Sequence, residues 1–433
     1  MSSIRTPLGH EPISTSHWSR TAPEAPPCPA LEGTIEADCT IIGAGYSGLI
    51  MALELAAAGR SVVVLDAEAP GWAASGRNAG HVAPLLWGAK KTPRQMVAAY
   101  GSDTGARMNR MIAGSGRWLF DLIDRHGITC DARKGYLCLA RTDASLAKQR
   151  GIFAEWSEFG GEFETIDRNG LAHHVNSPNY AGGVWLPNGG LVNPLALSRG
   201  LAAAAVREGV RLFGNSRALS AAKDGEAWRI QTAQGVVRSQ TLLVAAGGYA
   251  DALFPALRKT AYTVHCGVIA TDPLPDEGTS ILPSGTPIAD LDDKAVFSPA
   301  IDAEGCLVIS FLIGPGDLEM CKALKICAPR IAKAFPQFSQ PEFKRIWAGK
   351  FTITPDGAPR LLRLADNAFA ATGCNGLGHT LGISAARELA KLALGVDEDT
   401  MNFRVQDAKP LPASSAANWL LRHVAFPLVN RAG

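Results

Sequence analysis

The sequence predicts an α/β fold in which a parallel-sheet domain is interleaved with a second domain of antiparallel strands and helices. An apolar strand, helix and strand follow one another over residues 37–66, which is typical of a parallel βαβ unit. Further apolar strands recur at 241–246 and 367–373. Between these pieces, residues 91–187 and 261–345 contain helical patterns and alternating strands such as YTVHCGVIA and GCLVISFLI. A second domain threaded through the first is therefore expected.

Length and composition restrict the kind of protein. A chain of 433 residues with 47% hydrophobic content can bury a large core and predicts two domains. Its 42 basic and 40 acidic residues give a net charge of +2 without long runs of either sign, which indicates a small-molecule ligand rather than nucleic acid. Nine cysteines without a CxxC pair argue against a disulfide framework and a metal site. Together with the absence of a secretory signal pattern, they favour the cytoplasm.

The two ends of the chain differ from the middle. Residues 1–34 are rich in proline, which favours an extended arm on the surface. Residues 401–433 form a tail that includes the amphipathic stretch NWLLRHVAFPLVN. Packing of this stretch on its own protein is the favoured interpretation, and weak contact with a membrane surface is the alternative. The apolar stretch 39–58 is interpreted as a strand and a helix rather than a membrane span, because glycines and Glu54 interrupt it.

A nucleotide-binding motif lies between the first strand and the first helix. Gly43, Gly45 and Gly48 satisfy GxGxxG, with Tyr46 and Ser47 inside the motif. The first glycine permits the turn, the second lets the backbone approach a pyrophosphate, and the third lets the helix pack on the strand. The helix N-terminus then offers N–H groups to the phosphates. A glycine-rich turn without a ligand is the alternative.

An acidic residue follows the motif at the expected distance. Asp66 ends the second strand 18 residues after Gly48, where a carboxylate can accept hydrogen bonds from a ribose diol. The motif and this carboxylate predict a dinucleotide, but they do not distinguish NAD from FAD.

Longer stretches carry a resemblance that decides the cofactor. RSVVVLDAEAPGWAASGRNAGH, GGLVNPLALSRGLAAAAVREGV, TITPDGAPRL and ATGCNGLGHTLGISAARELAKLALG resemble segments of the D-amino-acid oxidase superfamily of FAD-dependent amine oxidoreductases. The GWxASGRNxG pattern is typical of the γ-glutamylputrescine oxidase-like branch. The resemblance covers nearly the whole chain and implies an FAD-binding domain of residues 35–90, 188–260 and 346–400. Residues 91–187 and 261–345 would then form the substrate domain.

The resemblance also implies residues that lie against the cofactor. Ser75, Gly76, Arg77 and Asn78 would face the flavin and the pyrophosphate, where small residues admit the backbone and the two polar side chains donate hydrogen bonds. A solvent-facing Arg-Asn turn is the alternative. Gly247, which follows a predicted strand, is placed with them.

The last helix, expected from about His379 to Leu394, would point its N-terminus at the flavin ring. Its entry contains the candidate cofactor-binding residues Gly373, Gly376, Leu377, Gly378 and Thr380. Free N–H groups and the helix dipole stabilise negative charge at such a position. A glycine-rich helix entry without a ligand is the alternative.

Two departures from the superfamily bear on the chemistry. Thr380 occupies the position at which sarcosine-oxidase-like members carry a carboxylate-binding lysine, so an amine without a carboxylate on its reacting carbon is expected. Gly349 occupies the position of the cysteine that attaches FAD covalently in those members. Noncovalent FAD is therefore expected.

Two residues are candidates for catalysis. His81 follows the flavin loop and could accept a proton from an ammonium substrate near neutral pH; a structural histidine is the alternative. Lys350, in WAGKFTITPD, could line the active site or order a water over the flavin, whereas an outward-pointing lysine on a strand is the alternative.

The expected function is FAD-dependent oxidation of an amine to an imine, which water hydrolyses to an aldehyde, with oxygen as acceptor giving hydrogen peroxide. A polyamine derivative such as γ-glutamylputrescine is the expected substrate class. One alternative is an amino-acid or amino-sulfonate dehydrogenase that passes electrons to a quinone or carrier protein. The other is a non-catalytic flavin-binding subunit, suggested by the altered loop Cys374-Asn375-Gly376-Leu377.

Overall fold

The computed structural model describes residues 8–85, 91–250, 253–276, 278–295, 297–338 and 341–431. Its largest sheet is built around the predicted βαβ unit, in which β1 (Gly33–Ile42) and β2 (Val62–Leu65) pair in parallel and α1 (Tyr46–Ala57) connects them. The sheet order is β18-β16-β17-β10-β1-β2-β7. The other strands of this path are β7 (Arg211–Phe213), β10 (Gly235–Val244), β16 (Arg360–Ala365), β17 (Ala368–Thr372) and β18 (Val405–Asp407).

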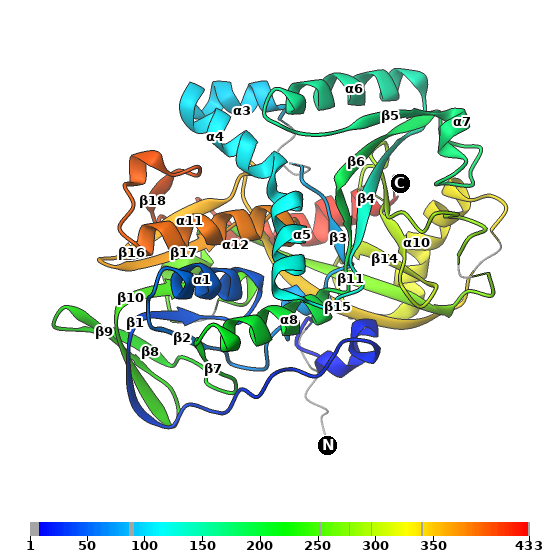
Figure 1. Cartoon of the computed structure of the whole chain (residues 1–433). Helices are drawn as coiled ribbons and strands as arrows, with labels where there is room; N and C mark the ends of the chain where they lie inside the picture. The colour runs from blue at the N-terminus through cyan, green and yellow to red at the C-terminus, as the bar shows by residue number, and fades with distance from the viewer. Residues whose placement is uncertain are drawn as a thin grey trace.

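Segments far apart in the chain therefore meet in one sheet. β10 lies between β1 and β17, and both contacts are parallel. An antiparallel extension of β10 is formed by β8 (Ser220–Asp224) and β9 (Ala227–Gln231). Three apolar helices, α1, α8 (Pro194–Arg207) and α11 (Ile383–Ala393), pack together on this sheet (Figure 1). The carboxyl ends of β1, β10 and β17 consequently lie at the same edge.

Two smaller sheets form the remaining part of the molecule. One has five strands: β3 (His81–Val82), β4 (Arg133–Ala140), β5 (Glu164–Asp167), β6 (Gly182–Leu191) and β12 (Ile288–Asp290). The other has the order β13-β14-β11-β15, with β11 (Tyr262–Pro273), β13 (Pro299–Ile301), β14 (Cys306–Leu312) and β15 (Phe343–Ile353). All pairings in the second sheet are antiparallel. The predicted α/β fold with an interleaved antiparallel α+β part is confirmed.

Helices surround these two sheets. They are α3 (Pro93–Tyr100), α4 (Ser102–Ala113), α5 (Ser115–His126), α6 (Asp143–Ser157), α7 (Arg168–Leu171) and α10 (Met320–Ala334). The short helix α9 (Pro255–Arg258) instead packs Leu257 into the core of the large sheet. Two of the domain boundaries expected from sequence fall inside strands, since residue 188 lies in β6 and residue 346 in β15. Both strands hydrogen-bond within the smaller sheets. The chain therefore passes from a smaller sheet to the large sheet only after each of these strands ends.

The N-terminal arm is more compact than expected. Residues 13–15 and 17–20 form two short 3-10 helices, η1 and η2, before an extended stretch leads to β1. Trp18 is 2% exposed and packs edge-on against Trp347, with 6.4 Å between ring centroids. Its indole N–H donates to the carbonyl of Asn78 at 2.8 Å. The arm is therefore part of the core, because burying a tryptophan outweighs an extended path on the surface.

The C-terminal tail packs on the protein only in part. Its first part contributes β18 to the large sheet, and its amphipathic part comprises α12 (Ser414–Leu420), the π-helical turn 421–425 and α13 (Phe426–Arg431). Phe426 is buried, but other apolar side chains are 42–58% exposed, namely Trp419, Leu420, Val424 and Leu428. In the part of the chain that the structure describes, no helix has the length and apolar character needed to span a bilayer.

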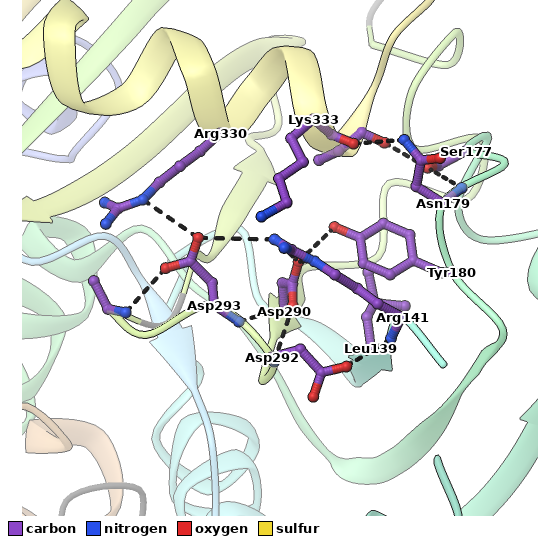
Figure 2. A network of polar contacts seen from close by, with 12 residues as sticks. Leu139, Arg141, Ser177, Asn179, Tyr180, Asp290, Asp292, Asp293, Arg330 and Lys333 are labelled. Carbon is purple, nitrogen blue, oxygen red and sulfur yellow. Dashed lines mark hydrogen bonds and ion pairs between the residues drawn. The ribbon is translucent and has the colours of Figure 1, made fainter. Parts of the chain in front are cut away.

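A buried ionic network joins β4, β12 and α10 (Figure 2). Asp290 accepts hydrogen bonds from Arg141 Nε at 2.8 Å and from the Tyr180 hydroxyl at 3.0 Å. Asp293 lies 3.3 Å from Arg330 Nε and 3.8 Å from Arg141. Both carboxylates are buried, so each depends on its arginine partners to compensate for lost hydration.

Candidate functional site

The glycine motif forms a turn that only glycine fits. Gly43 has φ of 108°, and a Cβ there would lie 2.9 Å from the Ala245 carbonyl oxygen. A Cβ on Gly48 would lie 1.8 Å from the Gly43 oxygen, so this glycine lets α1 pack on β1. Gly45 is the N-cap of α1 and provides no side-chain acceptor for the first helical N–H groups. The N-terminus of α1 is thus a preformed anion site.

Asp66 lies at the carboxyl end of β2, beside this turn. Its Oδ2 accepts the Ala44 N–H at 2.6 Å and its Oδ1 accepts the Glu68 N–H at 2.9 Å. A carboxylate can accept about four hydrogen bonds, so each oxygen retains capacity for a hydroxyl donor. Burial raises the pKa of Asp66 to about 6, which backbone hydrogen bonds partly oppose. Arg217, absent from the predicted set, lines the same end of the cavity.

A cavity of about 490 Å³ extends from Asp66 to the smaller sheets. Most of the predicted residues line it: Gly43, Gly45, Tyr46, Ser47, Asp66, Ser75, Arg77, Asn78, His81, Gly247, Lys350, Gly373, Gly376, Leu377 and Gly378. The other three, Gly48, Gly76 and Thr380, lie behind its wall.

These three residues lie outside the cavity lining for different reasons. The Cβ positions of Gly48 and Gly76 meet backbone oxygens at 1.8 and 2.2 Å, so both glycines serve close packing. Thr380 is fully buried and donates to the Ala83 carbonyl at 3.0 Å. The Thr380 hydroxyl is therefore directed at the Ala83 carbonyl, and a cofactor contact by this residue stays a prediction.

The loop before β3 is held by its own side chains. The Tyr46 N–H donates to Ser75 Oγ at 3.0 Å, which ties helix α2 (Ala74–Arg77) to the start of α1. Asn78 Nδ2 donates to the Ser75 carbonyl at 2.8 Å, and Asn78 Oδ1 accepts the Gly80 N–H at 2.8 Å. Asn78 was expected to donate to the cofactor, but its amide is already used in shaping this loop.

Arg77 also differs from expectation. Its guanidinium is 1% exposed and donates to the carbonyls of Trp72 at 2.6 Å, Ala348 at 3.4 Å and Glu11. Glu11 adds a carboxylate at 3.6 Å. Burial is the main cause that lowers the pKa of Arg77. A solvent-facing turn does not describe this residue. Three of its five N–H groups donate to Trp72, the arm and β15, and its contact with the cofactor stays a prediction.

Two buried histidines form the wall next to this loop. His81 Nε2 lies 3.1 Å from the Ser298 carbonyl, so it carries the proton, and Nδ1 has no hydrogen-bond partner among the described residues. His379 bridges the His81 carbonyl and the Tyr46 hydroxyl, both at 2.9 Å. Burial lowers the pKa of each histidine to about 4. Burial therefore disfavours proton uptake by His81 at neutral pH, and its role as a proton acceptor stays a prediction.

The N-terminal arm supplies a wall that the sequence did not predict. Lys350 Nζ lies 2.9 Å from His10 Nε2 and 4.4 Å from the centre of the Tyr249 ring. The His10 ring also contacts Trp72, at 5.5 Å between centroids. Lys350 lines the cavity together with His10, Trp72 and Tyr249. Its side chain is therefore directed inward rather than away from the protein.

The helix expected from about His379 to Leu394 begins at the cavity. Residues 378–382 form a π-helical turn that continues into α11. Its N-cap, Leu377, makes no side-chain cap, and Gly376, Gly378 and Gly382 line the cavity. N–H groups at such an end favour negative charge.

A second cavity of about 470 Å³ adjoins the first one. Both cavities are lined by Gly247, Gly248, Ala250, Leu257, Lys350, Thr352, Ala371 and Thr372. The tail closes the second cavity with Trp419, Arg422, His423 and Phe426. The exposed apolar tail therefore lies beside a space that reaches the main site.

A phosphate-binding cradle that faces antiparallel sheets across one cavity defines a two-domain, dinucleotide-dependent oxidoreductase. The profile of the FAD dependent oxidoreductase (DAO) family matches residues 38–392, and this chain belongs to that family. The glycine cradle, the carboxylate of Asp66 and the uncapped start of the last helix have the donors and acceptors that the pyrophosphate, the ribose and the ring of FAD require. The protein is an FAD-dependent oxidoreductase.

Relatives and solved structures agree with this assignment. The gamma-glutamylputrescine oxidoreductase of Escherichia coli (strain K12) is 30% identical over 92% of this chain and 93% of its own length. The D-amino acid dehydrogenase of Rhizorhabdus wittichii is 28% identical over 82% of this chain and 95% of its own length. Glycine oxidase from Geobacillus kaustophilus has a TM-score of 0.65 at 20% identity, covering 90% of this chain and 99% of that chain. L-amino acid deaminase from Proteus myxofaciens has a TM-score of 0.71 at 14% identity. The match covers 87% of this chain and 94% of that chain.

Proposed function

We propose that this protein oxidises an amine that binds in its neutral form. The observation that carries the proposal is the character of the cavity next to His81. Asp66 and Glu68, at the ribose end, are the only carboxylates among the described lining residues, whereas Lys350 and Arg77 are cationic. An ammonium group would find no counter-ion near His81, so the uncharged amine is the form that the cavity accepts.

His81 is proposed as the residue that orients the amine. Its Nδ1 is a lone-pair acceptor in the tautomer that donates from Nε2 to Ser298. An amine N–H can donate to this nitrogen without proton transfer. FAD, when bound, supplies the two-electron acceptor for oxidation of the C–N bond. The product imine is hydrolysed by water to an aldehyde.

The substrate class is proposed to be an amine without a carboxylate on its reacting carbon. Thr380 does not reach the cavity, Arg77 donates to three backbone carbonyls, and the cavity-lining amine of Lys350 is hydrogen-bonded to His10. We therefore expect none of these three residues to bind an α-carboxylate. The relation to a gamma-glutamylputrescine oxidoreductase suggests a polyamine derivative. Oxygen is proposed as the acceptor, with hydrogen peroxide as product, and a cytoplasmic location is consistent with nine free cysteines.

One assay tests this proposal. Anaerobic flavin reduction is measured with putrescine and γ-glutamylputrescine beside sarcosine, glycine, D-alanine and L-pipecolate. We expect kcat/KM to be highest for an amine of the first group. A higher value for any α-amino acid than for every amine contradicts the substrate class, and no reduction by any compound would favour the non-catalytic alternative.

A second candidate function is a dehydrogenase that passes electrons to a quinone or carrier protein. It is favoured by the second cavity, which joins the main cavity to the tail with its exposed Trp419, Leu420, Val424 and Leu428. Such a patch would suit a membrane surface or an apolar partner. Stopped-flow reoxidation of the reduced enzyme distinguishes the two functions: rapid reoxidation in air supports the oxidase, and reoxidation only with a soluble quinone supports the dehydrogenase.

A further inference from the structure

A cluster of side chains that could bind a metal lies outside the flavin cavity, where the N-terminal arm meets the hairpin between β13 and β14. It consists of His17 from η2 and of Asp302, Glu304 and Cys306 from the hairpin. Their candidate ligand atoms all lie within 4.8 Å of one another. His17, Asp302 and Cys306 are buried, and His17 Nε2 is in contact with Asp302 Oδ2.

The hairpin holds three of these residues in a fixed arrangement. Asp302 Oδ1 accepts the N–H groups of Glu304 at 2.9 Å and of Cys306 at 2.8 Å. The Asp302 N–H donates to the Cys306 carbonyl at 3.0 Å. One oxygen of Asp302 is thus occupied by the turn, and the other is directed at His17. The Asp302 side chain is therefore fixed before binding and loses little conformational entropy when it binds an ion.

The negative charges in this cluster favour a bound cation. The carboxylates of Asp302 and Glu304 converge on the thiol of Cys306. Glu304 Oε2 is a buried atom without a hydrogen-bond partner among the described residues. The Arg20 guanidinium forms an ion pair with it at 3.7 Å, which offsets part of its charge without a hydrogen bond. A bound divalent cation would offset these negative charges and stabilise the thiolate.

We propose that His17, Asp302, Glu304 and Cys306 bind one Zn²⁺ ion. An imidazole nitrogen, two carboxylate oxygens and a thiolate are the donor types of tetrahedral zinc, with bonds of about 2.0 to 2.3 Å. Binding forms the bond between zinc and Cys306 sulfur and releases the thiol proton to solvent. Four protein ligands leave no position for substrate, so the ion is structural and fastens the arm to the hairpin.

The proposal is tested on the FAD-loaded enzyme after chelator treatment and dialysis. Isothermal titration with ZnCl₂ is expected to give one ion per chain. X-ray absorption at the zinc edge is expected to show one sulfur at about 2.3 Å and nitrogen or oxygen scatterers at about 2.0 to 2.2 Å. At a hundredfold excess of zinc over its Kd, the melting temperature should rise by roughly 3 °C for a chain of this size.

Variants assign the ion to this cluster. Cys306→Ser should remove the sulfur signal, and His17→Gln and Glu304→Gln should each weaken binding at least tenfold. Glu304 is partly exposed, so Glu304→Gln retains a folded test protein. The matched control is Cys321→Ser, an exposed cysteine outside the cluster, which should leave binding unchanged. Absence of binding to the unaltered enzyme, or zinc binding that none of the three variants weakens, overturns the proposal.

Discussion

The amine of Lys350 lies 2.9 Å from Nε2 of His10, although the two residues are 340 positions apart in the sequence. Lys350 carries only donors, so the imidazole of His10 accepts this hydrogen bond. Tyr249 adds a ring face at 4.4 Å from the amine and donates its hydroxyl to the Gly9 carbonyl at 3.0 Å. The N-terminal arm thus positions the Lys350 ammonium group in the cavity.

Replacing His10 tests this contact. In His10→Ala the Lys350 amine loses its acceptor, and we expect kcat/KM for the best amine to fall about tenfold, which corresponds to the roughly 1.5 kcal/mol of a charge-assisted hydrogen bond. His10→Gln should recover most of the activity because its side-chain oxygen accepts. His173→Ala, at an exposed histidine, is the control. Equal activity of His10→Ala and the unaltered enzyme would show that His10 does not contribute to catalysis.

Asp66 should govern FAD affinity. In Asp66→Ala the ribose hydroxyls and the N–H groups of Ala44 and Glu68 lose their acceptor. The Kd for FAD should rise roughly 10- to 150-fold, or about 1.5 to 3 kcal/mol. FAD release is followed by flavin fluorescence, with Glu68→Ala as the control at a neighbouring carboxylate. An unchanged Kd in Asp66→Ala would exclude a ribose-binding role.

FAD should be released by denaturation. A Cβ on Gly349 would lie 3.4 Å from Arg77 Cβ, and the residue itself has no side chain to bond the cofactor. Cys266 and Cys374 are the two cysteines that line the cavity, so Cys266→Ser and Cys374→Ser should bind FAD as the unaltered protein does. Flavin that stays with the acid-precipitated polypeptide, and is lost in one of these variants, would identify a covalent link.

The pH dependence of kcat/KM should reflect the pKa of the substrate amine rather than the pKa of His81. Burial lowers the pKa of His81 to about 4, so this residue stays neutral throughout the working range. Only the neutral amine binds, and kcat/KM should therefore rise about tenfold per pH unit below the pKa of the amine. The measurement is anaerobic flavin reduction from pH 6 to about 10. An additional inflection near the usual histidine value of about 6.5, absent in His81→Gln, would instead assign proton transfer to His81.

The network of Figure 2 should contribute strongly to stability. Asp293→Ala removes the carboxylate that faces Arg330, whose side chain is 4% exposed, and leaves that cation buried. Urea unfolding should show a loss of about 3 to 5 kcal/mol. Glu342→Ala breaks an exposed pair with Lys344 and should cost less than about 1 kcal/mol. Similar effects of the two substitutions would contradict the importance of burial.

The sequence by itself determined the βαβ unit, the glycine turn and the position of Asp66. These features depend on neighbouring residues, because an apolar strand, a turn that excludes Cβ atoms and an apolar helix follow directly from local sequence. The start of the last helix was predictable for the same reason. The antiparallel strands 262–273 and 306–312 were also visible as alternating apolar patterns.

Only the tertiary structure decided how distant segments meet. It turned the proline-rich arm inward through Trp18, placed His10 beside Lys350, and directed three N–H groups of Arg77 to backbone carbonyls. It also set His17 against Asp302 across 285 positions. Burial and hydrogen-bond partners depend on which chain segments pack together, and neither residue type nor spacing records this packing.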